Sequence, residues 1–241
     1  MAELLVVIPT YNEADSLESV IRRTHASVPY ADVLIVDDAS PDGTGQIADR
    51  LAAEYANITV LHRPGKQGLG RAYLDGFAYA FARDYDFVAE MDADGSHDPA
   101  ELPAMLTLAQ DHADLVIGSR WVPGGTTKNW PPHRRLISRS GNLYSRVVLG
   151  SSIKDITAGF RVYRTDRLRE LGNPPGQSQG YCLQVELAWR LERGGARVVE
   201  HPIEFVERET GRSKMTAGII TEALVRVTGW GLTRGLRRKA A

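Results

Sequence analysis

The sequence lacks the features that mark several large classes of protein. Cys182 is the only cysteine among 241 residues, so an internal disulfide framework is excluded and no cysteine cluster is available to bind zinc. No run of about 18 apolar residues occurs, and the N-terminus has neither the basic segment nor the apolar run of a secretory signal. The 29 basic and 30 acidic residues almost cancel, which removes the global electrostatic basis for nucleic-acid binding. We therefore expect a cytosolic protein that binds no nucleic acid and holds any metal with oxygen ligands.

Short β-branched runs alternate with amphipathic segments through the first half of the chain. The expected strands lie at residues 4–8, 33–36, 58–61, 87–91 and 115–119. Between the first two strands we expect a helix capped by Asn12, whose buried face consists of Leu17, Val20, Ile21 and Thr24. Further helices are expected at 43–55, 70–83 and 100–110. This alternation predicts one α/β domain in which helices flank a mostly parallel sheet.

The pattern changes after about residue 120. The Gly/Pro-rich segment 123–132 is interpreted as a functional loop, and a basic helix is expected to begin near Arg134. A mixed region follows, with the segment GFRVY at 159–163, a helix around 185–193 and a strand at 203–206.

Polar residues follow three of the expected strands, at residues 9–13, 37–44 and 92–97. Asn, Asp, Ser and Gly are also the ordinary residues of turns, but ligands of parallel sheets collect beyond the carboxyl ends of the strands. If the extended conformation continues past the fourth strand, Asp92 and Asp94 project to one side and can share Mg²⁺ or Mn²⁺. The chain has no GxxxxGK[ST] phosphate loop, and no GxGxxG follows its first strand. The segments therefore predict a site for a phosphorylated ligand and a metal at this edge.

Eight segments resemble a known family in order and spacing. They are VIPTYNE, IVDDASPDGTG, KQGLGRAYLDGF, MDADGSHDP, GSRWVPGG, ITAGFRVYR, SQGYCLQVELAWR and PIEFVERETGRSK. Over residues 3–216 the chain resembles the dolichol- or polyprenol-phosphate mannose synthases, which are inverting family-two glycosyltransferases. The resemblance implies a single GT-A (Rossmann-like) domain at residues 1–216.

The resemblance also implies roles for individual residues on the donor side. The residues expected to form the nucleotide pocket are Pro9, Tyr11, Glu13, Val36 and Asp38. The Asp-X-Asp motif, Asp92, Ala93 and Asp94, would hold the donor diphosphate with Mg²⁺ or Mn²⁺. Ser96 occupies a position where relatives carry a glutamine metal ligand, so its hydroxyl is the candidate third ligand of the metal beside Asp92 and Asp94.

Basic residues are assigned to the two phosphate groups by the same resemblance. Arg120 and Arg134 would receive the acceptor phosphate, and Arg208 and Lys214 would close over the donor phosphates. His97 is interpreted as a loop histidine satisfied by a neighbouring carbonyl group rather than as a proton carrier.

The implied reaction transfers mannose from GDP-mannose to a polyprenyl (dolichyl) phosphate with inversion. A phosphomonoester has a second pKa of about 6, so the acceptor is largely a dianion at neutral pH and needs no strong general base. Two alternatives stay open. One is a polyprenyl-phosphate glucosyltransferase or another UDP-sugar-dependent enzyme of the same fold, and the other is a catalytically silent nucleotide-sugar-binding subunit.

Residues 217–241 form a separate segment, either part of the same domain or a membrane-docking extension. Apolar residues recur there at helical spacing, and the segment ends in Arg234, Arg237, Arg238 and Lys239. This pattern is typical of an interfacial helix on the cytoplasmic face of a membrane, although a helix packed on the domain with a solvated basic tail has the same spacing. Some members of the family carry transmembrane helices, so a separate integral membrane partner is also considered.

Overall fold

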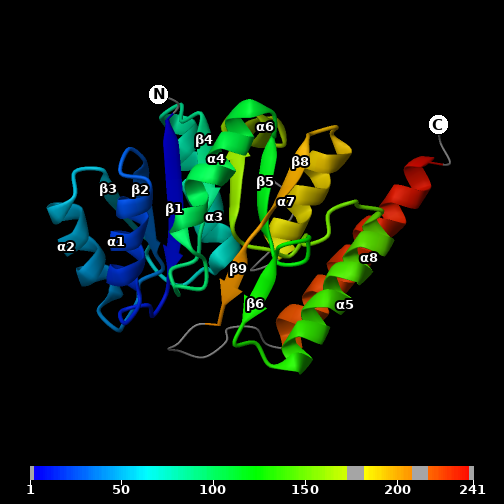
Figure 1. Cartoon of the computed structure of the whole chain (residues 1–241), viewed down its shortest axis with the longest axis horizontal. Helices are drawn as coiled ribbons and strands as arrows, with labels where there is room; N and C mark the ends of the chain where they lie inside the picture. The colour runs from blue at the N-terminus through cyan, green and yellow to red at the C-terminus, as the bar shows by residue number, and fades with distance from the viewer. Residues whose placement is uncertain (1–2, 173–181, 208–216, 239–241) are drawn as a thin grey trace.

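The apolar runs of the sequence form one central sheet in the computed structural model, which describes residues 3–172, 182–207 and 217–238 (Figure 1). Strands and helices alternate in the first half: β1 (Leu4–Thr10), α1 (Leu17–Ser27), β2 (Asp32–Asp37), α2 (Thr44–Glu54), β3 (Ile58–His62), α3 (Leu69–Ala82), β4 (Phe87–Glu90), η1 (Pro99–Glu101), α4 (Leu102–Asp111) and β5 (Leu115–Ser119). The second half adds β6 (Thr126–Lys128), α5 (Pro132–Leu149), β7 (Arg161–Arg164), α6 (Thr165–Glu170), α7 (Cys182–Arg193), β8 (Val198–Pro202), β9 (Glu204–Val206) and α8 (Ala217–Arg238).

The central sheet has seven strands in the order β3-β2-β1-β4-β7-β5-β8. All neighbouring strands are parallel except around β7, which runs antiparallel to both β4 and β5. The short strands β6 and β9 pair in parallel as a second sheet. Because the strands other than β7 share one direction, their carboxyl ends meet at one edge, where ligands of such sheets collect. The prediction of a mostly parallel α/β fold is confirmed.

Helices cover both faces of the sheet. Side chains alternate along each strand, so Leu4 and Val6 of β1 enter one core cluster whereas Leu5 and Val7 enter the other. The first cluster lies under α1, α2 and α4, and the second lies under α3, α6 and α7. The near-continuous apolar runs of the strands follow from this burial on both faces.

The expected strands and helices of the first half are all present, and the structure differs from the expectations at the start of α1 and in the second half of the chain. Helix α1 buries the four predicted residues, but it begins at Leu17 with Ser16 as its N-cap, so Asn12 does not cap it. Asn12 instead has a φ of 56°, in the left-handed region that asparagine tolerates. The segment interpreted as a loop at 123–132 contains β6, and β8 had not been predicted.

Helices α5 and α8 lie side by side at one end of the sheet (Figure 1). Helix α8 packs on the domain through Val227, which is buried, and through Trp230, whose ring stacks on Trp189 with centroids 5.9 Å apart. A Cβ atom at Gly231 would lie 2.5 Å from the side chain of Val148 in α5, so glycine allows this close approach. In the described part of the chain, none of the helices is both long enough and apolar enough to cross a membrane.

Candidate active site

The loops after β1 and β2 are joined by hydrogen bonds at the carboxyl edge of the sheet. Three consecutive backbone amides, at residues 12–14, donate to the side chains of Ser40, Thr44 and Asp42 over 2.9–3.1 Å. The short polar side chains of the loop after β2 therefore connect it to the loop after β1. This arrangement brings the predicted nucleotide-pocket residues of both loops together.

The pocket residues differ in their exposure. Pro9 and Val36 are opposite each other in the β1–β2 register and both are buried. Tyr11 and Glu13 are half-buried, and the ammonium nitrogen of Lys66 lies 3.9 Å from the centroid of the Tyr11 ring. An aromatic ring with a cation on its face, at this edge, is suited to stack on a base. The roles of these residues in nucleotide binding stay predictions.

Asp38 has protein partners for both of its carboxylate oxygens. Its Oδ1 accepts a hydrogen bond from Arg63, and its Oδ2 accepts from the amides of Gln67 and Gly68 at 3.2 and 3.0 Å. Arg63 also pairs with Asp75 at 2.8 Å. The buried carboxylate of Asp38 therefore holds the loop before α3 in place, whereas its predicted contact with the base or ribose stays a prediction.

The Asp-X-Asp motif lies in a turn, because β4 already ends at Glu90. The extended conformation on which the strand-periodicity argument depended does not continue to the two aspartates, so their shared metal site stays a prediction. Asp92 accepts a hydrogen bond at Oδ1 from the buried phenol of Tyr73 at 3.3 Å. Asp94 accepts at Oδ1 from the amide of Ser96 at 3.0 Å, and also from the Ser96 hydroxyl. Burial raises the pKa of Tyr73 well above its usual value, which keeps this donor protonated.

The carboxylates of Asp92 and Asp94 fit a divalent metal whose coordination shell is completed by the phosphates of a bound ligand. No group of three or more His, Cys, Asp or Glu side chains that could hold a metal occurs within the described ranges. Mg²⁺ and Mn²⁺ are commonly held by one or two carboxylates together with substrate phosphates and water, a shell that Asp92 and Asp94 can start. The Ser96 hydroxyl is engaged with Asp94, so its role as a further ligand stays a prediction.

His97 supports the backbone of this turn. Its Nδ1 accepts a hydrogen bond from the amide of Asp92 at 3.2 Å, so its partner is not the carbonyl group that we expected. The ring stacks on Phe160 with centroids 5.0 Å apart and meets Phe205 edge-on at 5.4 Å. Burial lowers the pKa of His97, which favours the neutral ring that this bond requires.

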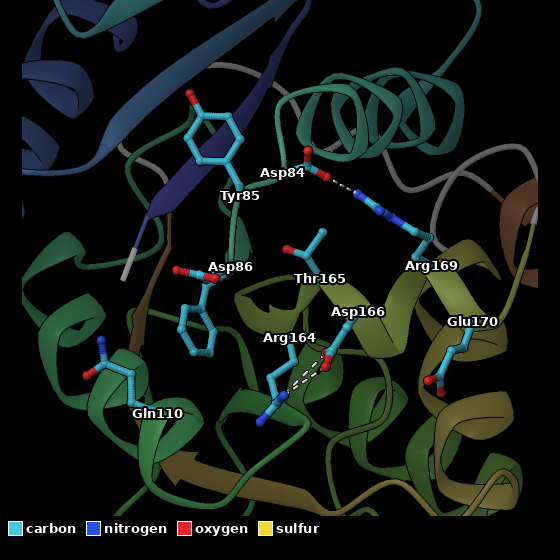
Figure 2. A pocket seen from close by; sticks show the side chains of 10 residues that line it. Asp84, Tyr85, Asp86, Gln110, Arg164, Thr165, Asp166, Arg169 and Glu170 are labelled. Atoms are coloured by element: carbon cyan, nitrogen blue, oxygen red, sulfur yellow. Dashed lines mark hydrogen bonds and ion pairs between the residues drawn. The ribbon is translucent and has the colours of Figure 1, made fainter. Parts of the chain in front are cut away.

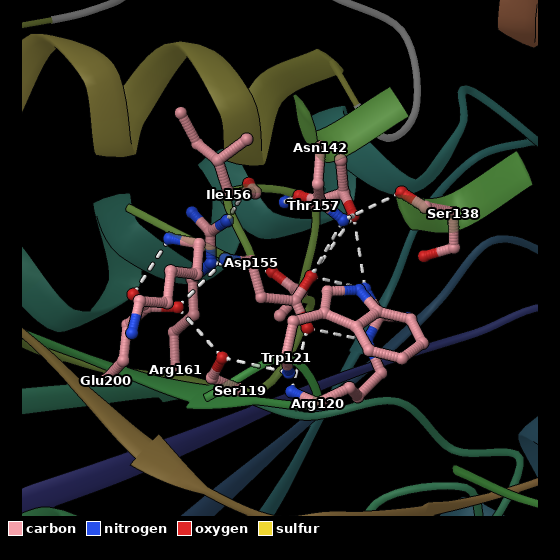
Figure 3. Close-up of polar contacts among 12 residues, drawn as sticks. Ser119, Arg120, Trp121, Ser138, Asn142, Asp155, Ile156, Thr157, Arg161 and Glu200 are labelled. Carbon is pink, nitrogen blue, oxygen red and sulfur yellow. Dashed lines mark hydrogen bonds and ion pairs between the residues drawn. The ribbon is translucent and has the colours of Figure 1, made fainter. Parts of the chain in front are cut away.

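Arg120 is buried in a polar network that sequence reasoning missed (Figure 3). Its Nε and Nη2 atoms each donate to an oxygen of Asp155 over 2.7 Å, and its Nη2 also donates to Thr157 at 3.1 Å. Asn142 of α5 donates to the same Asp155 and Thr157 oxygens, and Glu200 of β8 accepts from the Asp155 amide at 2.8 Å. The structure gives the guanidinium of Arg120 a buried carboxylate partner, and its predicted contact with the acceptor phosphate stays a prediction.

Arg161 holds the segment that carries Asp155. It is fully buried, and its guanidinium donates to the carbonyl oxygens of Ala158, Gln184 and Ile156 over 2.6–2.8 Å. Glu90 is opposite it in the β4–β7 register. Burial raises the pKa of Glu90 to about 8, although the positive charge of Arg161 opposes this shift.

Arg134 lies where α5 begins, beside an aromatic cluster. Its Nη1 contacts Glu207, and its Cζ lies 4.5 Å from the centroid of the Trp130 ring. Trp130 meets Phe205 edge-on at 5.3 Å, and Arg120 lies 5.4 Å from the ring centroids of both. Since Phe205 also contacts the His97 ring, the cluster connects the Asp-X-Asp turn with Arg134. The predicted donor-phosphate residues Arg208 and Lys214 lie outside the described residues.

A cavity of about 720 Å³ lies at the other edge of the sheet, where β4 begins and β7 ends (Figure 2). Its two arginines are paired with lining aspartates: Arg164 with Asp166 at 2.7 Å, and Arg169 with Asp84 at 3.1 Å. It contains none of the predicted site residues. The polar groups of the carboxyl edge therefore form the candidate site.

Comparison with known proteins identifies the family of the chain. Residues 5–172 match the family model described as glycosyl transferase family 2. The chain is 53% identical over 239 residues to an undecaprenyl-phosphate mannosyltransferase of Micrococcus luteus, with 98% of each chain covered. It is 49% identical over 235 residues to a polyprenol monophosphomannose synthase of Mycolicibacterium smegmatis, with 97% of this chain and 89% of the relative covered.

Solved structures share the fold at low sequence identity. The mannosyltransferase PcManGT of Pyrobaculum calidifontis, in complex with GDP-Man and Mn²⁺, has a TM-score of 0.62 at 16% identity, covering 99% of this chain and 75% of that one. A glucosyl-3-phosphoglycerate synthase of Mycobacterium tuberculosis has a TM-score of 0.67 at 19% identity, covering 97% of this chain and 80% of that one. The match of the family model to most of its length, with the two relatives at 53% and 49% identity, shows that the chain belongs to glycosyltransferase family 2.

Proposed function

We propose that this chain transfers a mannosyl group from GDP-mannose to a polyprenyl phosphate, with inversion at the anomeric carbon. The observation that carries the proposal is its likeness, over almost its whole length, to two bacterial relatives named as mannosyltransferases of polyprenyl phosphates. The donor nucleotide is inferred from the sequence resemblance and from the GDP-Man that PcManGT holds.

On the donor side, Asp92 and Asp94 would hold Mg²⁺ or Mn²⁺ against the diphosphate. The metal would neutralise the charge that develops on the departing nucleoside diphosphate. The hydrogen bonds from Tyr73 and Ser96 orient the two carboxylates before the ligands arrive. The ring of Tyr11 would stack on the base.

On the acceptor side, a phosphate oxygen would attack the anomeric carbon directly. The new bond joins that oxygen to the carbon, the bond from the carbon to the diphosphate breaks, and its electron pair leaves with GDP. The acceptor is already largely dianionic at neutral pH, so no proton has to be removed by the protein. Arg134 would hold the acceptor phosphate in line. Arg120, which is paired with Asp155, lies against the same Trp130 ring as Arg134.

Helices α5 and α8 supply a surface suited to the membrane in which such an acceptor resides. Their most exposed large apolar side chains are Leu136, Leu143, Val147, Val225 and Leu232. Helix α5 has four arginines and no acidic residue, and α8 has four arginines and one glutamate, in a chain with a formal net charge of −1. Exposed apolar side chains, together with the basic composition of the two helices, favour peripheral binding to an anionic bilayer. We place this surface on the cytoplasmic face, and a separate integral membrane partner would strengthen the attachment.

One experiment tests the function and its alternatives. The purified chain is incubated with a short polyprenyl phosphate, a panel of labelled GDP- and UDP-sugars, and Mg²⁺ or Mn²⁺, and the labelled lipid is then extracted. We expect label in the lipid from GDP-mannose, and loss of that label when a chelator is added. Transfer from a UDP-sugar alone would identify the glucosyltransferase alternative. Binding of a nucleotide sugar without transfer would identify the silent subunit.

A further inference from the structure

Glu207 forms an ion pair with Arg134, the residue to which we assign the acceptor phosphate. Its Oε1 accepts a hydrogen bond from Arg134, and the two side chains are only 26% and 29% exposed. The Glu207 amide donates to the carbonyl oxygen of Lys128 at 3.0 Å. This bond extends the β6–β9 pairing by one residue, so the carboxylate is attached to an ordered backbone and remains near Arg134.

The carboxylate is bound asymmetrically. Among the described residues, its other oxygen, Oε2, is buried and has no hydrogen-bond partner. A buried carboxylate oxygen without a donor is costly, so this arrangement holds the anion less firmly than a fully satisfied site would. Asp155 provides the contrast, because both of its oxygens accept hydrogen bonds from Arg120 or its neighbours. Arg134 therefore has a carboxylate partner that an incoming anion can displace.

We propose that Glu207 competes with the acceptor phosphate for Arg134 and thereby speeds the release of the product. This inference rests on the proposed function. The acceptor enters as a phosphomonoester dianion and leaves as a phosphodiester with one negative charge, because one phosphate oxygen has become bonded to the sugar. Coulomb attraction to Arg134 falls with that charge. Glu207 carries the same single charge as the product and is tethered beside Arg134, where its effective concentration is high.

The Arg134–Glu207 pair would therefore favour binding of the dianionic acceptor over binding of the monoanionic product. The dianionic acceptor can displace Glu207 from Arg134, whereas the monoanionic product is attracted to Arg134 less strongly and competes with Glu207 less well. After transfer, Glu207 returns to Arg134 and the lipid product leaves. Removing the charge of Glu207 should therefore tighten the binding of both acceptor and product.

The test compares Glu207→Gln with Glu204→Gln. Glu204 lies on the same short strand but is exposed, and its nearest cationic partner is Lys128 at 3.9 Å. For Glu207→Gln we expect the KM for a short polyprenyl phosphate and the inhibition constant of the lipid product each to fall about threefold to tenfold, the scale of a charged pair that is partly exposed. The steady-state kcat should fall, while the single-turnover rate stays unchanged and a burst of product appears. Glu204→Gln should change none of these values.

Two results would overturn the inference. A raised KM for the acceptor would mean that Glu207 orients Arg134 for binding, and unchanged constants would mean that the ion pair has no part in binding or release. If Glu207→Gln folds poorly, Glu207→Ala should shift the constants in the same direction. Calorimetry with the short polyprenyl phosphate alone separates this inference from the proposed function. Tighter binding in Glu207→Gln supports the competition even if the unmodified chain transfers no mannose, and unchanged binding rejects it even if transfer is observed.

Discussion

Arg120 and Asp155 form a bidentate ion pair inside the protein, with both nitrogen–oxygen distances at 2.7 Å. The Arg120 amide also donates to the same carboxylate at 2.9 Å. The charged groups are 9% and 0% exposed, so water does not screen them. Such a pair fixes the guanidinium of Arg120 in one orientation at the carboxyl edge of the sheet.

We expect Asp155→Asn to destabilise the fold by about 3–5 kcal/mol, because it leaves the buried charge of Arg120 without a counter-charge. Urea unfolding of the two proteins measures the difference. Asp166→Asn is the matched control, since Asp166 pairs with Arg164 at 2.7 Å but the side chains are 57% and 44% exposed. Asp166→Asn should lower the free energy of unfolding by less than about 1 kcal/mol. An equal loss of stability in both variants would contradict the special role of the buried Arg120–Asp155 pair.

Asp94→Asn should reduce transfer by about 100-fold or more, the scale of losing one preorganised electrostatic contact, with little change in melting temperature. Activity assays over a range of Mg²⁺ and Mn²⁺ concentrations measure the effect. Asp98→Asn is the control, because Asp98 lies in the same connection but is exposed and pairs with Arg23. Turnover by the unmodified protein that persists in excess chelator would reject the metal site.

Arg134→Ala should raise the KM for polyprenyl phosphate by at least about tenfold, since a charge-assisted contact is lost, and should leave the affinity for the donor nucleotide unchanged. Kinetics with a short acceptor and calorimetry with GDP separate the two effects. Arg135→Ala is the control, because Arg135 is next to Arg134 in the sequence and its side chain is exposed. An equal loss of GDP affinity would move Arg134 to the donor site.

Leu136→Glu in α5 and Val225→Glu in α8 should each weaken binding to vesicles that contain phosphatidylglycerol by about tenfold, because each side chain would contribute apolar area to the bilayer. Both residues are largely exposed, at 67% and 68%, so the fold should be retained. Co-sedimentation measures the binding. Ala78→Glu, at an exposed position of α3, should have little effect. Vesicle binding unchanged in all three variants would reject the α5–α8 surface.

The single thiol predicts a pH dependence. Burial raises the pKa of Cys182 to about 11, so at pH 8 only about one thiol in a thousand is the reactive thiolate. Labelling of the folded protein by a disulfide reagent should therefore be slow at pH 8, and its rate should increase as the pH rises towards 11. The protein unfolded in guanidinium should react within seconds to minutes. Rapid labelling of the folded protein at pH 8 would contradict the burial of this residue.

Local patterns in the sequence were sufficient for the strands and helices of the first half, whereas the roles of the site residues were taken from the family resemblance and stay predictions. Apolar runs such as those of β1 and β2 are long and buried on both faces, which makes their signal clear. The partners of Arg120 and Arg134 could not be found in the same way. Asp155 is 35 residues from Arg120, and Glu207 is 73 residues from Arg134. Their contacts depend on the order of the strands in the sheet, which local periodicity does not encode.

The inverted direction of β7 limits how the chain can vary in length. Because β7 runs against its neighbours, the residues before it, from Asp155 to Gly159, reach the carboxyl edge of the sheet. The register places Arg161 opposite Glu90. Deleting one residue between Asp155 and Arg161 would either pull Asp155 away from Arg120 or turn Arg161 to the other face of the sheet. Insertions and deletions among relatives should therefore avoid this short stretch and gather at the opposite edge of the sheet.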